Sequence, residues 1–423
     1  MHIFLADLII LFYKYRFISY DLTKPQKYFT FVQHKMKYIP DYILMPNGTI
    51  KSGLEINVSE DGTIVSIHEL GKPVENSESV CNINGLLLPG LVNAHCHLEL
   101  SWSKGLYPVN AGMEAFYGAM SGIHTRRPND TSVQTAIQDA IDELIYSGTV
   151  AVCDISNTQL TIPAKQDSSI CFHTFLECFG TNTADAILRM KNILDVQSAF
   201  KSRKQPCSLS AHTLFTLSDA LMGMMMEKIQ ADGETHSIHF MESLAEKDFF
   251  EKKRPVKHVH DQNNDATMYH TAADAACSLL PTENKILFVH NTYAEKSDIN
   301  KLLNHFEDPW FCLCPASNLY INNTLPHVPM LLSSTTNIVL GTDSYSSNTR
   351  LNLFSEIDLL LKAFPTVKPE SLLMAATLNG AKFMELDGTL GSFEINKKPG
   401  LIGLTDYRPG CRNFSSLKIT RFI

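Results

Sequence analysis

Short apolar segments and helical patterns alternate along most of the chain, from His97 to Asp343. Strands that alternate with helices in this way predict βα units and a parallel sheet. With the apolar segment that ends at His97, the pattern contains eight strands and fits a (β/α)8, TIM-like barrel of the α/β class. We expect the seven later strands at residues 149–154, 170–176, 207–211, 237–240, 286–289, 311–314 and 337–340.

Helix signals lie between these strands. Thr131 is the expected N-cap of one helix, and Ser218 is the expected N-cap of another, which Gly233 ends. The run Met224-Met225-Met226 falls inside this second helix and is typical of helix packing. Further helices are expected at residues 184–199, 353–362 and 369–384.

Both ends of the chain differ from this pattern. Alternating apolar residues flank an Asp61-Gly62 turn signal near the N-terminus, which indicates a β-hairpin. Short strands also follow the last predicted helix, so we expect a small β-sandwich domain built from both chain ends. The first segment matches neither pattern; it is mostly apolar but too short for a membrane span. We expect a disordered extension or a mis-assigned start, with a weakly membrane-associating segment as the alternative. The predicted units are 1–35 (extension), 36–88 plus 386–423 (small β domain) and 89–385 (barrel).

Composition narrows the class of partner and the compartment. A formal net charge of -8 argues against nucleic acid as the main partner. Ten cysteines in 423 residues show no disulfide framework, which favours a cytoplasmic location. Cys312 and Cys314 lie on an apolar strand and are expected in the core. We expect a small-molecule substrate and neither nucleic acid nor a membrane as partner, and a homodimer stays open.

Seven polar residues lie at or just beyond the ends of the predicted strands, where a barrel carries its active site. His95 and His97 are two positions apart on a strand, so their imidazoles point to the same side. Imidazoles and a carboxylate suit a catalytic Zn²⁺, which lowers the pKa of its bound water from about 15.7 to about 7. Each residue taken singly is equally typical of an ordinary polar strand end. The seven are His95, His97, His212, His239, Glu242, His290 and Asp343.

Four of these residues form the predicted metal site, and the others have separate predicted roles. The ligands are His95, His97, His239 and Asp343. Glu242 follows its strand by two residues and can carry a proton between water and substrate; otherwise it is a surface glutamate. His290 can polarise the atom under attack, and His212 can touch substrate. His258 and His260 fall in the polar segment 248–265 and are read as solvated.

Five motifs resemble the amidohydrolase superfamily, in its cytosine deaminase and chlorohydrolase-like branch. The opening motif is similar to that family's His-x-His strand, and the segment that begins at His239 is similar to its H-x-x-E motif. The motif around His97 looks most like the aminodeoxyfutalosine (adenosine-analogue) deaminases. The matching segments are 89–97, 210–215, 239–243 with Glu246, 314–319, and 341–344 with 351–354.

The resemblance implies hydrolytic deamination of an amino-purine nucleoside or a related heterocycle by a metal-bound hydroxide. It implies one divalent metal, Zn²⁺ with Fe²⁺ as the alternative, and catalytic roles for Glu242, His290 and Asp343. A lysine that would bridge two metals is absent between residues 208 and 217. The resemblance also makes Glu99, Trp102 and His212 candidates for substrate binding; a rim carboxylate and a packing aromatic are the alternatives for the first two.

Two other functions remain open at this stage. A cyclic amide or a ring C–Cl bond can be hydrolysed by a similar centre, because amine and halide leaving groups look alike in these motifs. A barrel without activity, used for binding, is expected to have lost a ligand or the proton-carrying Glu242. Metal content and a panel of amines distinguish the three.

Overall fold

The computed structural model describes residues 35–71, 79–259 and 268–423. The predicted extension therefore lies outside the described residues except for Lys35, which begins the first strand. His260, predicted to be solvated, also lies outside them. Among the helices of the described ranges, none is long and apolar enough to cross a membrane.

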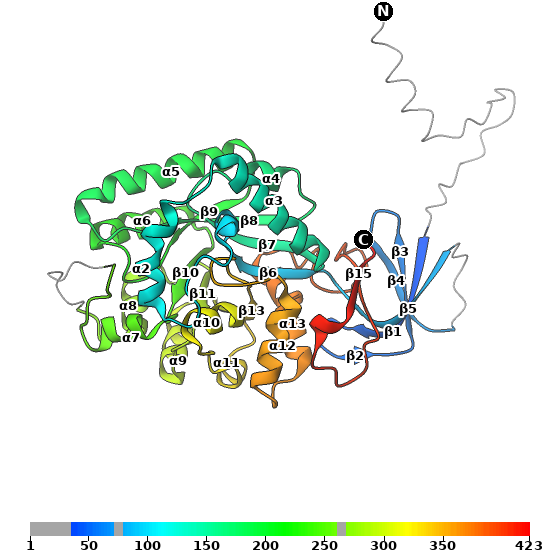
Figure 1. The fold of residues 1–423 in the computed structure, drawn as a ribbon. Helices are drawn as coiled ribbons and strands as arrows, with labels where there is room; N and C mark the ends of the chain where they lie inside the picture. The colour runs from blue at the N-terminus through cyan, green and yellow to red at the C-terminus, as the bar shows by residue number, and fades with distance from the viewer. Residues whose placement is uncertain (1–34, 72–78, 260–267) are drawn as a thin grey trace, which may run out of the picture. The chain divides into compact units, whose positions relative to one another are not determined.

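One seven-stranded sheet combines strands from the first and the last parts of the described chain (Figure 1). The C-terminal strand β14 pairs antiparallel with β5, with Gly403 opposite Leu87, so a strand from each part of the predicted small domain lies in this sheet; the bounds of the domain stay a prediction. The Asp61-Gly62 turn joins β3 to β4 as expected. That this domain is a sandwich stays a prediction. Its strands are β1 (Lys35–Leu44), β2 (Ile50–Lys51), β3 (Leu54–Ser59), β4 (Ile64–Glu69), β5 (Ser79–Leu88), β14 (Ile402–Thr405) and β15 (Lys418–Arg421).

Eight further strands form two parallel four-stranded sheets, with helices outside them (Figure 1). All eight predicted strands are present, with ends that differ from the prediction by up to two residues, except that β6 begins at Leu91. The sheets are β6 (Leu91–Cys96), β7 (Thr149–Ser156), β8 (Cys171–Cys178) and β9 (Cys207–Ala211), followed by β10 (His236–Phe240), β11 (Ile286–His290), β12 (Pro309–Leu313) and β13 (Ile338–Leu340).

Backbone hydrogen bonds connect the two sheets at both pairs of edges. The amide of His239 donates to the carbonyl of His212, which follows β9. At the other edge, the amides of Thr342 and Asp343 donate to the carbonyl of His95 on β6. The ends of four strands that carry predicted site residues are therefore tied directly to one another.

The helices cover the sheets much as the pattern predicts, with two corrections. The N-cap of α3 is Asn129 and not Thr131, because the Asn129 side chain accepts from the amide of Ser132. The helix expected at 369–384 is two helices, interrupted at Thr377, whose φ of -130° and ψ of -94° are not helical. Ser218 and Gly233 bound α6 as predicted. The helices are α2 (Met113–His124), α3 (Asp130–Tyr146), α4 (Ile162–Gln166), α5 (Ala186–Ser202), α6 (Asp219–Asp232), α7 (Leu244–Glu251), α8 (Ala272–Leu279), α9 (Lys296–His305), α10 (Pro315–Asn322), α11 (Val328–Ser334), α12 (Leu353–Ala363), α13 (Pro369–Ala375) and α14 (Leu378–Phe383), with 3-10 turns η1 (Leu98–Ser103), η2 (Thr183–Asp185) and η3 (Phe414–Ser416).

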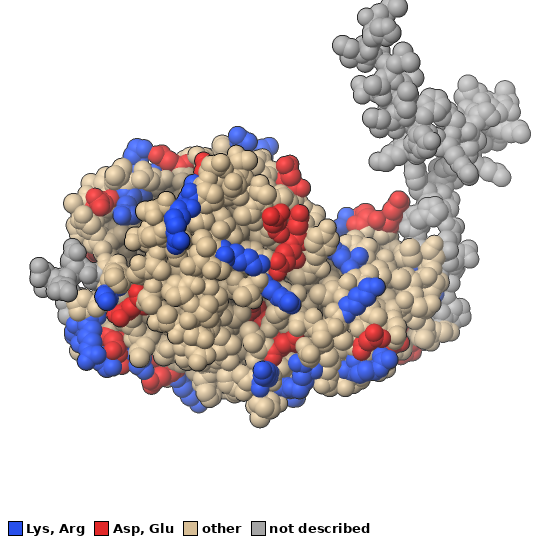
Figure 2. Space-filling view, in the orientation of Figure 1, with Lys and Arg blue, Asp and Glu red and all other residues tan. Residues whose placement is uncertain are grey.

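Apolar side chains fill the space inside the sheets and the layer between sheets and helices. Met225 and Met226 are buried in that outer layer, as the helix-packing interpretation requires. Cys312 and Cys314 are buried inside, with their Sγ atoms 3.9 Å apart. On the surface, acidic and basic side chains are interspersed over the face seen in Figure 2 rather than gathered by sign.

Candidate active site

The predicted site residues meet at the carboxyl ends of the parallel strands. His95 is on β6 and His97 directly follows that strand, while His239 is on β10. His290 ends β11, and Asp343 lies three residues beyond β13. Strand order brings these ends to one edge, because every strand in the two sheets runs in the same direction.

Three imidazole nitrogens converge in the centre of this edge. The Nε2 atom of His97 lies 3.1 Å from that of His95 and 3.3 Å from that of His239. The Asp343 Oδ1 atom lies 3.5 Å from His97 Nε2 and 3.7 Å from His95 Nε2. Ligand atoms at 2.0–2.1 Å from one tetrahedral Zn²⁺ are about 3.3 Å from each other. The donor set therefore fits a single divalent metal.

The hydrogen bonds around this cluster also fit a metal. The Nδ1 atom of His239 faces Glu177 Oε1 at 3.3 Å and the carbonyl of His212 at 3.1 Å. A proton on Nδ1 satisfies both acceptors and leaves the Nε2 lone pair directed at the cluster. Three neutral imidazoles cannot all donate to each other through Nε2, and their close approach suits the binding of one shared cation.

Asp343 is held by two hydroxyl groups. Ser317 on α10 and Ser347 on the loop after β13 donate to Asp343 Oδ2 at 2.5 and 2.6 Å. The bonds use one carboxylate oxygen and leave Oδ1 facing the histidines. Nearby histidines, above all His95, outweigh burial and hold the pKa of Asp343 well below its usual value. The carboxylate is therefore charged and fixed in direction.

Glu242 and His290 form a second group beside the first. Glu242 Oε1 lies 3.4 Å from His290 Nε2, and one ligand atom from each of Glu242, His290 and Asp343 lies within 4.8 Å of the others. Asn318 contacts the other ring nitrogen of His290, Nδ1, at 3.0 Å. Burial raises the pKa of Glu242 to about 8. The carboxyl group can therefore hold or release a proton near neutral pH.

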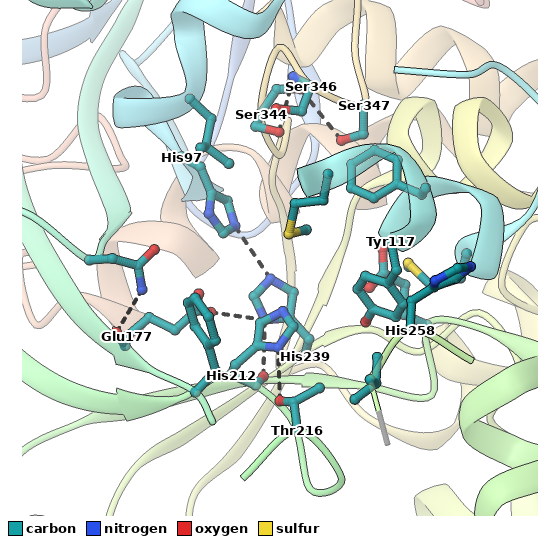
Figure 3. A pocket seen from close by; sticks show the side chains of 18 of the residues that line it. His97, Tyr117, Glu177, His212, Thr216, His239, His258, Ser344, Ser346 and Ser347 are labelled. Atoms are coloured by element: carbon teal, nitrogen blue, oxygen red, sulfur yellow. Dashed lines mark hydrogen bonds and ion pairs between the residues drawn. The ribbon is translucent and has the colours of Figure 1, made fainter. Parts of the chain in front are cut away.

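A cavity of about 360 Å³ opens over both groups (Figure 3). His97, His239, Glu242 and Asp343 line it, together with aromatic side chains of α2. His212 lines the cavity as predicted, with its Nδ1 atom 2.9 Å from the Thr216 hydroxyl. The volume and the mixed polar and aromatic lining suit a small heterocyclic ligand.

His258, predicted to be solvated, is exposed as expected, and it also lines the cavity (Figure 3). Its ring lies against Gly118 of α2. The polar composition of the segment gave no sign of this contact. The contact depends on how the chain after α7 folds back toward α2, which is a tertiary feature.

Glu99 and Trp102 are not among the described residues that line the cavity. The Glu99 carboxylate accepts hydrogen bonds from the amides of Asn157 and Thr158, at 2.8 and 3.1 Å. Trp102 packs beside the apolar cluster under η1. This geometry leaves Glu99 behind Asn157, which itself lines the cavity, so direct substrate contacts for Glu99 and Trp102 do not fit the structure.

The site also contains residues that the sequence interpretation missed. Glu177 is the next-to-last residue of β8 and lies beside both His212 and His239. Tyr117 on α2 lines the cavity (Figure 3). Glu177 lies close to the carboxyl end of a strand like the other candidates, so its position was the available signal. Tyr117 gave none, because only tertiary packing brings α2 over the strands.

Comparisons with known proteins agree with this geometry. The profile of the amidohydrolase family matches residues 86–414. An adenosine deaminase of Helicobacter pylori is 25% identical over 336 residues, which cover 75% of this chain and 78% of the relative. The crystal structure of H. pylori aminofutalosine deaminase in complex with methylthio-coformycin superposes with a TM-score of 0.76 at 19% identity and covers 92% of this chain and 100% of that one. A Xanthomonas campestris adenosine deaminase with bound zinc has a TM-score of 0.70 at 18% identity, covering 90% and 88%. These matches imply a TIM-like barrel, in agreement with the two parallel sheets.

Proposed function

Because the chain belongs to the amidohydrolase family, we propose that it is a metal-dependent deaminase of adenosine-type nucleosides. Relatives named as adenosine and aminofutalosine deaminases support the reaction class. The observation that carries the proposal is the approach of Glu242 and His290 to the cluster of His95, His97, His239 and Asp343 at the base of one cavity. Hydrolytic deamination needs an activated water and a proton carrier within reach of the same ring carbon.

The metal ligands in this proposal are His95, His97, His239 and Asp343. Three imidazoles and one carboxylate are typical of Zn²⁺, and Fe²⁺ accepts the same donors. A bound divalent metal lowers the pKa of a water to about 7. Glu177 and Ser317 orient two of these ligands through His239 Nδ1 and Asp343 Oδ2.

Glu242 is the proton carrier in this proposal. It takes a proton from the attacking water and delivers it to the ring nitrogen next to the amino-bearing carbon. The ring carbon gains the water oxygen as a hydroxyl group. That hydroxyl then gives up its proton, through Glu242, to the amino group, which leaves as ammonia while the oxygen becomes the ring carbonyl. His290, held by Asn318, faces the same space and donates to the added oxygen or polarises it. His212 lines the cavity beside His239, and in this proposal it contacts the heterocyclic ring of the substrate.

The wider architecture extends this proposal. Backbone bonds at both edges of the two sheets support a closed (β/α)8 barrel for residues 89–385, with 36–88 and 386–423 as the small domain. All ten cysteines of the chain lie in described residues and none is in a disulfide, which supports a reducing, cytoplasmic compartment. The proposal also includes a homodimer, which a measurement of molecular mass in solution tests.

An amine panel tests the reaction. The purified chain is supplied with Zn²⁺ and incubated with adenosine, a 5′-substituted adenosine, guanine and cytosine, and ammonia is measured. We expect release from the adenosine compounds first. Hydrolysis of a cyclic amide or release of chloride from a chlorinated triazine, with no ammonia from any amine, would replace deamination by the alternative hydrolase functions.

Glu242→Gln tests the proton carrier. The amide keeps the shape of the side chain but cannot accept the proton, so we expect kcat to fall by roughly 10²–10⁴-fold with metal content unchanged. Metal content is measured by elemental analysis beside the rate. Glu251→Gln, on the exposed side of α7, is the matched control. An unchanged rate in Glu242→Gln would remove Glu242 from the reaction.

A further inference from the structure

Glu242 lies on a turn whose backbone has an unusual conformation. Met241, between β10 and Glu242, has a φ of +49°, in the left-handed region that non-glycine residues seldom adopt. Such a conformation persists where surrounding contacts hold it in place. One such contact is a backbone bond from the amide of Tyr293 to the carbonyl of Met241, at 2.9 Å. Two side chains hold the backbone of the next residue, Glu242, at its amide and at its carbonyl.

Glu246 holds the N-terminal side of Glu242. Its Oε2 atom accepts a hydrogen bond from the backbone amide of Glu242 at 3.0 Å, and its side chain is almost fully buried at 1% exposure. The amide of Glu246 in turn bonds to Ser243 Oγ, the N-cap of α7. In an ordinary capping box the glutamate at this spacing returns to the amide of the cap itself. Here it reaches one residue further back, to Glu242.

Asn322 holds the C-terminal side of the same residue. Its Nδ2 atom donates to the backbone carbonyl of Glu242 at 3.1 Å. Asn322 is the last residue of α10, one turn after Asn318, which contacts His290. The two asparagines therefore lie on one face of the helix, and that face meets both members of the Glu242–His290 pair.

We propose that Glu246 and Asn322 are positioning residues that together fix the direction of the Glu242 carboxylate over the reaction centre. This inference rests on the proposed function of Glu242. Hydrogen bonds at the amide and at the carbonyl of Glu242 restrict rotation about its backbone φ and ψ bonds. The Cα–Cβ bond of Glu242 therefore points in one direction. A misplacement of about 1 Å at a catalytic group can cost about 10²-fold in rate.

Variants at the two positions separate this role from general support of the fold. Glu246→Gln keeps an acceptor oxygen, whereas Glu246→Ala and Asn322→Leu each remove one bond to the Glu242 backbone. We expect Glu246→Ala and Asn322→Leu to lower kcat by roughly 10–100-fold with KM and metal content changed little. Glu246→Gln should restore most of kcat. Glu251→Ala on α7 is the matched control and should keep wild-type values.

Hydrogen–deuterium exchange supplies a readout that needs no substrate. The peptide that contains the Glu242 amide should exchange slowly in the wild type and in Glu246→Gln, and faster in Glu246→Ala, at a temperature where all the variants are folded. Unchanged exchange in Glu246→Ala, or faster exchange with an unchanged kcat, would overturn the positioning role. If the wild type releases no ammonia from any amine, the proposed deamination fails, and the exchange rates alone then decide whether the two side chains hold this turn.

Discussion

One buried histidine outside the active site has no hydrogen-bond partner for either ring nitrogen among the residues described. His236 begins β10 and is 1% exposed. Its position is two strand residues before Ile238, so it points with Ile238 toward the helix layer and away from His239. An unpartnered imidazole in an apolar layer is costly to protonate.

The burial of His236 predicts that part of the unfolding free energy is lost at acid pH. Burial lowers the pKa of His236 to about 4, below the ordinary 6.5 of an unfolded chain. Between these values the unfolded chain takes up a proton that the folded chain does not, so stability falls as pH decreases from about 6.5 to about 4. His236→Leu should remove this loss. The unfolding free energy of the variant, measured with urea relative to that of the wild type, should therefore increase by about 2 kcal/mol from pH 7.5 to pH 5. His305→Leu, at an exposed position on α9, should show no such trend. A gain that is constant with pH would contradict the prediction.

Single residues were predictable from the sequence where a local motif carries the chemistry. His95, His97 and His239 were expected together because alternation along a strand and a strand-end position decide where they point. Glu99 was predicted to contact substrate because it lies only two residues after His97, but closeness in sequence does not decide where its side chain points. Its carboxylate turns to two backbone amides after β7, and no pattern in the sequence records that pairing.

At the scale of elements, α10 contacts more of the site than its length suggests. Ser317 donates to Asp343, Asn318 contacts His290, and Asn322 donates to the backbone of Glu242. These three groups follow three different strands. A buried carboxylate of α12, Glu356, accepts from the amide of Ala316 at the start of α10 and fixes the helix in turn.

Ser317→Ala tests this helix through the metal. Loss of the hydroxyl leaves Asp343 Oδ2 with Ser347 as its remaining hydroxyl donor among the described residues. Removing one such supporting bond typically weakens metal binding by about 10–100-fold. Zn²⁺ affinity is measured by competition with a chelator, with Ser333→Ala on exposed α11 as the control. Equal affinity in the two variants would show that Ser347 alone is enough.

Elements were predicted well where periodicity is strong and less well where tertiary contacts override it. The strands followed the expected ranges closely because buried parallel strands are continuous apolar runs. The helix expected at 369–384 breaks at Thr377, and the carbonyl of Ala376 beside it accepts from the amide of Val92 on β6. That bond joins segments far apart in the sequence, so helical spacing alone could not reveal the break.

At the scale of the whole molecule, the small sheet joins the two ends of the chain. Gly85 on β5 has a φ of +147° and lies opposite Thr405 on β14. A Cβ atom at this position would overlap the carbonyl oxygen of Leu404. The sequence indicated that both ends contribute to one domain, but the pairing of β5 with β14 could not be read from it because register depends on the partner.

Gly85→Ala tests the connection between the ends. The added methyl group forces β14 away from β5, so we expect a loss of about 2–4 kcal/mol in unfolding free energy. Limited proteolysis should then cut the C-terminal segment first. Gly53→Ala, at a turn with open space around the glycine and a φ of +72°, is a control for placing a side chain at a positive φ without any contact to another strand. Equal losses in the two variants would assign the effect to φ and not to strand pairing.

The pairing of β5 with β14 also sets an order of events during synthesis. The two strands are separated by roughly 300 residues, which a ribosome adds in about 15–60 s. For that time one edge of β5 has its backbone groups unpaired, while the parallel strands that follow are still being made. Nascent chains stalled before Ile402 should therefore bind holdase chaperones through this edge, and release of the last residues should end that dependence.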